Sequence, residues 1–514
     1  MPATVNTVLS ACRRTADLAA LAEGGEVDVV VIGGGITGVG IALDAASRGL
    51  SVALVEKHDL AFGTSRWSSK LVHGGLRYLA TGNVGIARRS AVERGILMSR
   101  NAPHLVKPMA QLVPLLPAMS RFQRGLVRVG FLAGDGLRAM AGTKSSILPR
   151  PRRISAAEAV AMSPTVRRDG LDGGLLAYDG QLIDDARLVV AVARTAAQQG
   201  ARILTRVGAS AATGTSVRLT DELTGESLDL RSRAVINATG VWAAEVDSSI
   251  KLRPSRGTHL VFDSAAFGNP TAALTVPIPG ETNRFVFAMP EQLGRVYLGL
   301  TDEEAPGPIP DVPEPSPEEI TFLLDTVNTA LQTTLTPADV AGAYAGLRPL
   351  IDAGEGRTSD LSREHAVLES DSGLFSIVGG KLTEYRLMAE DVLDRAVAAR
   401  GLGGTPCRTR DLPLVGAPGN PGVTASATGE LPASLVARYG AEAPGVVGSA
   451  HCARPADPVA DGIDVTRAEF EFAVTHEGAL DAGDILDRRT RIGLVAADRQ
   501  RALAAAEELL ASTR

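Results

Sequence analysis

The sequence predicts an α/β protein with a parallel-sheet domain, an antiparallel-sheet domain interleaved with it, and a C-terminal α-helical domain. Three observations lead to this fold class. An apolar strand at residues 27–32 runs into a glycine-rich turn, several β-like runs lie between residues 253 and 302, and residues 431–514 have a mostly helical pattern. A chain of 514 residues exceeds one ordinary domain, which fits this division.

A glycine-rich turn between a strand and a helix identifies the first domain. Gly33, Gly35 and Gly38 have the spacing G-x-G-x-x-G. The first glycine permits a tight turn, the second lets the backbone approach a pyrophosphate, and the third lets the helix pack on the strand. The helix N-terminus offers N–H groups and a partial positive charge to phosphates. We therefore predict a Rossmann-type dinucleotide site. Its turn residues are Gly33, Gly34, Gly35, Ile36, Thr37 and Gly38.

An acidic residue closes the next strand. A helix is expected from Ile36 to Arg48 and a strand from Ser51 to Val55, with Glu56 directly after it. Glu56 follows the turn by about the 20 residues expected for the acid that binds a ribose 2′-hydroxyl. The whole strand–turn–helix–strand–acid unit is far more specific than the glycines alone. The carboxylate favours FAD or NAD over NADP, because it would repel a 2′-phosphate.

Further elements follow in order along the chain. Ser155 and Ser316 each begin a capping-box pattern, and each should start a helix. The remaining predicted elements are a helix at 184–199, strands at 201–207 and 234–237, antiparallel strands at 258–262, 284–288 and 295–300, a strand at 374–378 and a helix to about 399. A loop-and-helix insertion is expected at 58–115. In the C-terminal part, residues 488–510 have helical spacing.

The expected domain boundaries follow from these elements. Residues 1–25 form an N-terminal extension, helical or frayed. Residues 26–400 hold the dinucleotide-binding part and a substrate part, the latter mainly at 80–180 and 253–350. The proline- and glycine-rich residues 401–430 have the composition of a linker, and 431–514 form the helical domain.

Composition narrows the class of protein. The net charge of −6 is the opposite of the basic charge typical of nucleic-acid-binding proteins. Cys12, Cys407 and Cys452 are far apart and form no C-x-x-C, which suggests a reducing compartment without a disulfide framework, and we expect no metal site. No apolar run reaches the roughly 18–20 residues of a membrane span.

Residues 118–153 form a basic segment of mixed polarity. Eight arginines and lysines stand against a single acid, Asp135, among apolar side chains such as Phe122 and Met140. An amphipathic basic surface suits a leaflet of anionic lipids. The alternative is a solvated basic face that covers the core.

Several long motifs, in order, resemble the FAD-dependent glycerol-3-phosphate dehydrogenases. The first is GTSRWSSKLVHGGLRYL at residues 63–79, and the others lie at 238–242, 257–259, 299–302, 346–350 and 379–383. The match extends over about residues 26–400, and the C-terminal part resembles that family's helical cap. Two departures are Glu384, where many relatives carry a second threonine, and residues 1–25, which extend the usual start.

The resemblance implies an enzyme of glycerol metabolism. It would oxidise sn-glycerol 3-phosphate to dihydroxyacetone phosphate, with hydride moving to flavin N5 and electrons passing from FAD to a membrane quinone. We expect noncovalent FAD, since no His or Cys stands in an evident attachment motif. The protein would lie in the cytoplasm, attached peripherally to the inner face of the cell membrane through residues 118–153. A homodimer is also considered.

Three stretches supply the remaining expected FAD contacts. A hydroxyl-rich loop follows the second strand, a small-residue turn follows the strand at 234–237, and a helix start would point its amides at the flavin N1–O2 edge. These residues are Thr64, Ser65, Ser68, Ser69, Lys70, His73, Ala238, Gly240, Gly380, Leu382 and Thr383. The alternatives are a polar surface loop and an ordinary strand-to-helix turn.

The expected substrate residues follow from the chemistry of the reaction. A phosphate needs permanently charged donors, for which Arg77 beside Tyr78 and Arg348 are the candidates. The hydroxyl proton needs a base near neutrality, with His259 first and His73 second. Lys381 would stabilise the developing alkoxide and the reduced flavin.

Three other functions are compatible with parts of this pattern. A glycerol-3-phosphate oxidase would use the same fold and give electrons to oxygen. An amine or amino-acid oxidase would bind a carboxylate instead of a phosphate. A non-catalytic flavin-binding protein would have no need for the complete set of polar positions.

Overall fold

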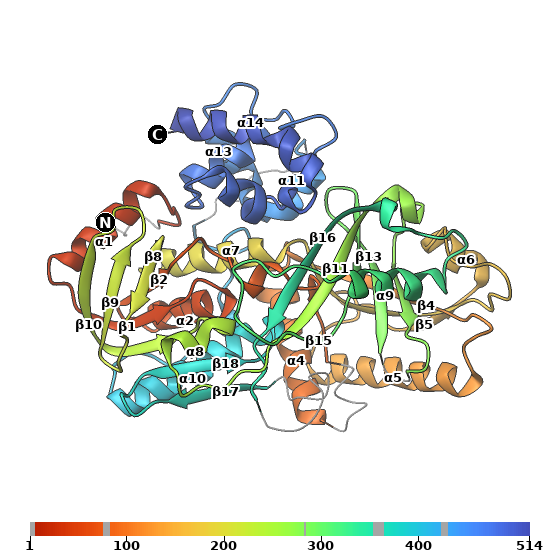
Figure 1. The fold of residues 1–514 in the computed structure, drawn as a ribbon, viewed down its shortest axis with the longest axis horizontal. Coiled ribbons are helices and arrows are strands. Elements are labelled where there is room, and N and C mark those ends of the chain that lie inside the picture. The colour runs from red at the N-terminus through yellow and green to blue at the C-terminus, as the bar shows by residue number, and fades with distance from the viewer. Residues whose placement is uncertain (1–5, 76–82, 282–283, 353–363, 423–429, 514) are drawn as a thin grey trace.

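The structure, a computed structural model, describes residues 6–75, 83–281, 284–352, 364–422 and 430–513. Over these residues two sheets lie side by side, and a helical C-terminal domain lies across one edge of the pair (Figure 1). The predicted α/β class, with a Rossmann-type domain, an interleaved antiparallel sheet and a helical C-terminal domain, is confirmed.

The first sheet has a parallel centre. Its strands run in the order β17–β18–β10–β1–β2–β7, with β17 antiparallel at the edge and the β8–β9 pair attached to β10. The strands are β1 (Val27–Ile32), β2 (Val52–Glu56), β7 (Arg202–Thr205), β8 (Val207–Ser210), β9 (Ser216–Asp221), β10 (Ser227–Asn237), β17 (His365–Glu369) and β18 (Phe375–Gly379). The central strands are nearly continuous apolar runs because both faces of the sheet are covered.

Helices α2 (Ile36–Ser47), α7 (Asp185–Gln198) and α10 (Tyr385–Arg400) pack together on one face of this sheet. The β8–β9 layer covers part of the other face. The N-terminal extension contains α1 (Ala11–Ala22), which packs against β7. It is anchored by Arg14, whose guanidinium contacts Asp221 at 2.5 Å.

The second sheet carries the predicted antiparallel strands. β11 (Ser255–Asp263) pairs with β14 (Arg295–Gly299) and β16 (Val340–Arg348), all antiparallel. The other strands are β3 (Leu71–Val72), β4 (Val106–Pro114), β5 (Arg152–Ile154), β6 (Gly174–Leu182), β12 (Ala273–Pro277), β13 (Phe285–Glu291) and β15 (Glu303–Glu304). The prediction of only loops and helices for residues 58–115 is wrong at Val106–Pro114, which form the strand β4. Its prolines, Pro108 and Pro114, hide the strand pattern.

The helices around the second sheet are α4 (Val84–Ile96), α5 (Arg121–Met140), α6 (Ala156–Met162) and α9 (Pro317–Asn328), whereas the short α8 (Ala243–Val246) packs against the first sheet. Both helices predicted from capping patterns form, and Ser316 makes the full capping box with Glu319. The long helix α5 lies along the outer side of the sheet (Figure 1). None of the described helices combines the length and apolar character that a membrane crossing requires.

The C-terminal domain has its own apolar core. Its helices are α11 (Ala433–Tyr439), α12 (Ala443–Gly448), α13 (Arg467–Thr475) and α14 (Ala496–Thr513). The closing helix begins at Ala496, not at Arg488 as predicted. A π-helical turn at 484–489 and the left-handed Arg491 (φ +62°) precede it. The preceding residues 402–422 pack tightly against the first domain, with Leu414 only 1% exposed.

Candidate functional site

The glycine-rich turn lies where β1, α2 and β10 come closest together. Gly33 has φ +112°, and a Cβ there would lie 2.7 Å from the carbonyl oxygen of Ala238. A Cβ on Gly38 would lie 1.9 Å from the carbonyl oxygen of Gly33. Only glycine fits either position, so the helix can start directly at the strand end and its N-terminus can face a ligand.

Glu56 lies beneath this turn at the end of β2. Its carboxylate accepts a hydrogen bond from the backbone N–H of Gly34 (2.6 Å) and another from that of His58 (2.8 Å). Burial raises the pKa of the Glu56 carboxyl, although the two backbone donors oppose the shift. The side chain lines the same cavity as the turn, at the place expected for a ribose-binding acid.

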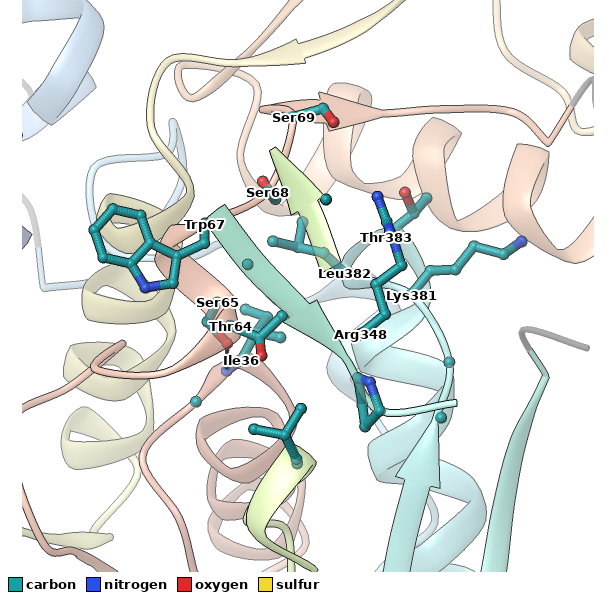
Figure 2. A pocket seen from close by; sticks show the side chains of 18 of the residues that line it. Ile36, Thr64, Ser65, Trp67, Ser68, Ser69, Arg348, Lys381, Leu382 and Thr383 are labelled. Atoms are coloured by element: carbon teal, nitrogen blue, oxygen red, sulfur yellow. Dashed lines mark hydrogen bonds between the residues drawn. The ribbon is translucent and has the colours of Figure 1, made fainter. Parts of the chain in front are cut away.

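A single cavity of about 1020 Å³ joins the turn to the second sheet. Figure 2 shows Ile36, Thr64 and Ser65 on one side, Lys381 and its neighbours on the other, and Arg348 between them. The structure brings most of the predicted site residues to this wall. They are Gly33, Gly35, Ile36, Thr37, Glu56, Thr64, Ser65, Ser68, Ser69, His73, Ala238, Gly240, His259, Arg348, Gly380, Lys381, Leu382 and Thr383.

The hydroxyl-rich loop is tied to the protein by its own side chains. Thr64 donates to the carbonyl of Leu347 (2.6 Å), and Ser65 accepts from the backbone N–H of Ile36 (2.9 Å). The Ser68 hydroxyl donates to Asp185 (2.8 Å). These hydroxyls hold the loop in place, and one N–H of the α2 N-terminus is already bonded to Ser65.

Lys70 lies apart from the cavity, contrary to the expected contact with the cofactor. Its ammonium is 2.8 Å from Asp185, and the side chain is 1% exposed. Burial lowers the pKa of Lys70, and Asp185 opposes that shift. The lysine is therefore used to anchor the loop to α7.

His259 is a buried, neutral imidazole on β11. Burial, with the nearby charges of Lys70 and Arg348, lowers its pKa well below the ordinary value, and so below the near-neutral pKa expected of the base; the ring is unprotonated at neutral pH. Its Nε2 lies 2.9 Å from the Ser69 hydroxyl. The ring stacks on Tyr344 of β16, with centroids 4.8 Å apart, and Gly299 leaves the space that the ring occupies.

Arg348 ends β16 beside the same cavity. Its guanidinium donates to the carboxylate of Asp302 (3.2 Å) and to the carbonyl of Thr301 (3.2 Å). A Cβ on Gly257 would lie 2.3 Å from this guanidinium, so glycine is what admits the arginine here. The side chain is held in place yet 20% exposed, which leaves it able to receive an anion.

Lys381 precedes the short turn that leads into α10. Its ammonium contacts Ser90 of α4 (2.7 Å) and the carboxylate of Glu384 (3.2 Å). The predicted phosphate-binding pair, Arg77 and Tyr78, lies outside the described residues.

The sequence reasoning missed some of the residues that shape this site. Tyr344 supports His259, Asp302 orients Arg348, and Ser90 with Glu384 holds Lys381. Asp302 belongs to the motif at 299–302 and Glu384 directly follows the motif at 379–383, so these motifs are the signals that could have identified both residues. No local pattern points to Tyr344 or Ser90. The pairing of β11 with β16 places Tyr344 beside His259, and the packing of α4 places Ser90 beside Lys381.

The site fits a dinucleotide. The turn at 33–38 excludes any side chain from the space at the helix start, and the cavity is large and extends from this turn to His259. At the far end, the buried Nδ1 of His259 has no hydrogen-bond partner among the described residues.

Two family models match the chain. One, described as FAD dependent oxidoreductase, covers residues 28–386, and the other, described as the C-terminal domain of alpha-glycerophosphate oxidase, covers residues 407–513. The glycerol-3-phosphate dehydrogenase 1 of Mycobacterium tuberculosis is 74% identical over 98% of this chain and 99% of its own length. The aerobic glycerol-3-phosphate dehydrogenase of Staphylococcus aureus is 37% identical over 76% of this chain and 71% of its own.

Solved structures agree with this relationship. The glycerol-3-phosphate dehydrogenase of Bacillus halodurans, complexed with FAD, superposes with a TM-score of 0.73 at 28% identity, covering 98% of this chain and 94% of that one. The L-alpha-glycerophosphate oxidase of Mycoplasma pneumoniae (TM-score 0.56, 18% identity, 76% and 99% covered) shares the fold. The predicted family and its FAD cofactor are thus confirmed. The chain belongs to the FAD-dependent glycerol-3-phosphate dehydrogenase family.

Proposed function

We propose that this protein oxidises sn-glycerol 3-phosphate to dihydroxyacetone phosphate and passes the electrons to a membrane quinone. One observation carries the proposal. A neutral histidine and a permanently charged arginine lie on adjacent antiparallel strands and face the same cavity as the dinucleotide turn. A base and an anion-binding group that line one cavity suit a phosphorylated alcohol.

His259 would accept the proton of the substrate C2 hydroxyl. Its depressed pKa keeps the imidazole neutral, and the stacked Tyr344 holds the ring plane. Arg348 would bind the phosphate, together with Arg77 and Tyr78, whose role rests on the family resemblance alone. Lys381 would stabilise negative charge as it develops on the substrate oxygen.

FAD, when bound, supplies the acceptor for the two electrons. The turn at 33–38 would hold the pyrophosphate of FAD, and Glu56 would bind its ribose. Glu56 lines the cavity, and the glycines of the turn keep side chains out of the space beside it. Ala238, Gly240 and residues 380–383 would lie along the flavin. We propose that the flavin is held without a covalent bond.

The long helix α5 supports a membrane-bound acceptor. It exposes Phe122, Val129, Leu132 and Met140, which are 56–74% exposed. Leu126, Val129 and Phe131 of the same helix line the cavity. An apolar, basic face that borders the cavity would let a lipid-soluble quinone approach from an anionic leaflet. We place the protein in the cytoplasm, at the inner face of the cell membrane.

The test is an anaerobic absorbance spectrum of the purified protein with glycerol 3-phosphate. Bleaching of the flavin band, followed by rapid reoxidation with a soluble quinone and slow reoxidation in air, is the expected result. Near-stoichiometric hydrogen peroxide in air would identify an oxidase instead. A flavin that bleaches with glycine or D-alanine but not with glycerol 3-phosphate would identify an amino-acid oxidase. Failure to bleach with any phosphorylated polyol would leave a flavin-binding protein without this activity.

A further inference from the structure

Lys381 is held by two buried side chains from different elements. Its ammonium lies 2.7 Å from the hydroxyl of Ser90 on α4 and 3.2 Å from the carboxylate of Glu384. The Ser90 hydroxyl in turn donates to that same carboxylate. Ser90 is fully buried and Glu384 is 1% exposed. The three groups therefore form a closed triangle in the protein interior, at the edge of the cavity.

The position of this ammonium would be loose without such contacts. A lysine has a flexible four-carbon stem, and its three donors impose no fixed direction. Figure 2 shows the Lys381 side chain extending away from Thr64 and Ser65. Two anchors that also bind each other restrict the ammonium to one place.

We infer that Glu384 is a positioning residue, which together with Ser90 fixes the ammonium of Lys381 for the reaction. This inference rests on the proposed function, because it assigns Lys381 a contact with the reacting substrate. A single carboxylate oxygen of Glu384, Oε1, accepts from both the Lys381 ammonium and the Ser90 hydroxyl, so one side chain holds both donors at one point.

The first test compares variants at both anchors. Glu384→Ala and Ser90→Ala should each lower kcat by about 10-fold and change KM by less than about 3-fold, because the lost interaction belongs to the transition state. Glu384→Gln keeps an acceptor oxygen and should stay within about 3-fold of the wild type. In a Lys381→Met background, Glu384→Ala should have no further effect on kcat, because Glu384 acts through the lysine.

A matched control comes from the same two helices. Glu93 of α4 pairs with Arg386 of α10 at 2.7 Å, one turn beyond the triangle, and does not touch Lys381. Glu93→Gln should loosen the docking of α4 on α10 as much as Glu384→Gln, yet leave kcat unchanged. A fall in kcat equal to that of Glu384→Ala would assign the effect to helix docking and overturn the inference.

The second test needs neither flavin nor turnover. Acetic anhydride labelling of the purified protein, read at Lys381 by mass spectrometry, should be at least about 5-fold faster in Glu384→Ala and Ser90→Ala than in the wild type. Glu93→Gln should label at the wild-type rate. Unchanged labelling in both alanine variants would overturn the inference even if one variant folded poorly.

The two proposals fail separately. If the wild type does not oxidise glycerol 3-phosphate, the proposed function is wrong, but the labelling still shows whether Glu384 and Ser90 hold the ammonium of Lys381. If the wild type is active and Glu384→Ala matches it, the positioning role falls alone. If Glu384→Gln is as slow as Glu384→Ala, charge and not position is what matters, which also contradicts the inference.

Discussion

Two arginine-rich regions of this protein use the same side chain in opposite ways. In the joint between the C-terminal domain and the loop after β2, which we call the arginine joint, Arg488, Arg489 and Arg491 are nearly fully buried. On α5, Arg121 and Arg128 are exposed beside exposed apolar residues. The arginine joint holds two domains together, whereas the exposed arginines of α5 are accessible to a binding partner.

The arginine joint satisfies its charges internally. Arg489 makes a two-pronged contact with Asp59 at 2.7 and 2.8 Å, and Arg488 reaches the same carboxylate at 2.6 Å. Burial alone would raise the pKa of Asp59, but these two guanidinium groups lower it below the ordinary value. Arg491 donates to the carbonyl of Arg66, in the loop that lines the cavity. The joint thus fixes the loop from behind.

The helix α5 leaves its outer face unmatched. Arg124 and Arg138 pair with Asp172 and Asp135, while no acidic partner is found for Arg121 or Arg128 among the described residues. The comparison indicates that buried arginines in this protein are structural, and that exposed ones beside apolar side chains are available for binding.

The largest effect is expected in the arginine joint. Arg489→Ala leaves Asp59 buried without its main partner, which should cost about 3–5 kcal/mol of unfolding free energy and weaken FAD retention. Urea unfolding followed by circular dichroism, with flavin release in parallel, measures both. Arg218→Ala is the control, because its ion pair with Asp229 is exposed to solvent and should contribute little to the unfolding free energy. Equal losses of unfolding free energy in Arg489→Ala and Arg218→Ala would show that the buried arginine contributes no more to stability than the exposed one.

The stability of the arginine joint should also depend on pH. The folded pKa of Asp59 is lowered, so its contribution is present above the ordinary pKa near 3.8 and is lost as pH falls toward the folded value. The difference in unfolding free energy between the wild type and Asp59→Asn should therefore shrink below about pH 4. A difference that stays constant down to pH 3 would show that Asp59 is not charged in the folded protein.

A smaller effect is expected from the apolar face of α5. Phe122→Ser with Leu132→Ser should lower binding to anionic lipid vesicles by roughly 10- to 100-fold, or about 1.4–2.7 kcal/mol, because side chains at a membrane surface are only partly inserted and full insertion contributes about 1.5–3 kcal/mol for each. Unfolding free energy should change by less than about 0.5 kcal/mol, because both residues are exposed. Vesicle co-sedimentation is the measurement, and unchanged binding would remove α5 from the membrane proposal.

The smallest effect is expected from single charges on α5. Arg121→Gln or Arg128→Gln should weaken binding to the same vesicles by about 1 kcal/mol each, and the loss should disappear at high salt. Neutral vesicles serve as the control. A loss that is equal on neutral and anionic vesicles would exclude an electrostatic role.

The sequence predicted what depends on neighbours along the chain. The turn at 33–38, Glu56 and the helix after Gly380 follow from local strand–turn–helix patterns, and the structure has all of them. Residues 118–153 were predicted only as an amphipathic basic surface, and the helix at Arg121–Met140 was not predicted.

What depends on distant partners could not be predicted. Arg489 and Asp59 are 430 positions apart, so no local pattern links them, and the helical spacing from 488 onward concealed the π-helical turn there. The hydroxyls of Thr64 and Ser68 were expected to face the cofactor, but they donate to Leu347 and Asp185 instead. These two acceptors come from other elements of the fold, so no local pattern points to them.

The arginine joint has a consequence for biosynthesis. Domains generally fold as they emerge from the ribosome, the N-terminal ones first. The loop behind the flavin cavity, however, receives its anchors from Arg488, Arg489 and Arg491, which follow it by 425–430 positions. A nascent polypeptide halted before these residues would have a complete glycine turn but an unanchored cavity wall, so stable binding of the coenzyme requires translation beyond residue 491.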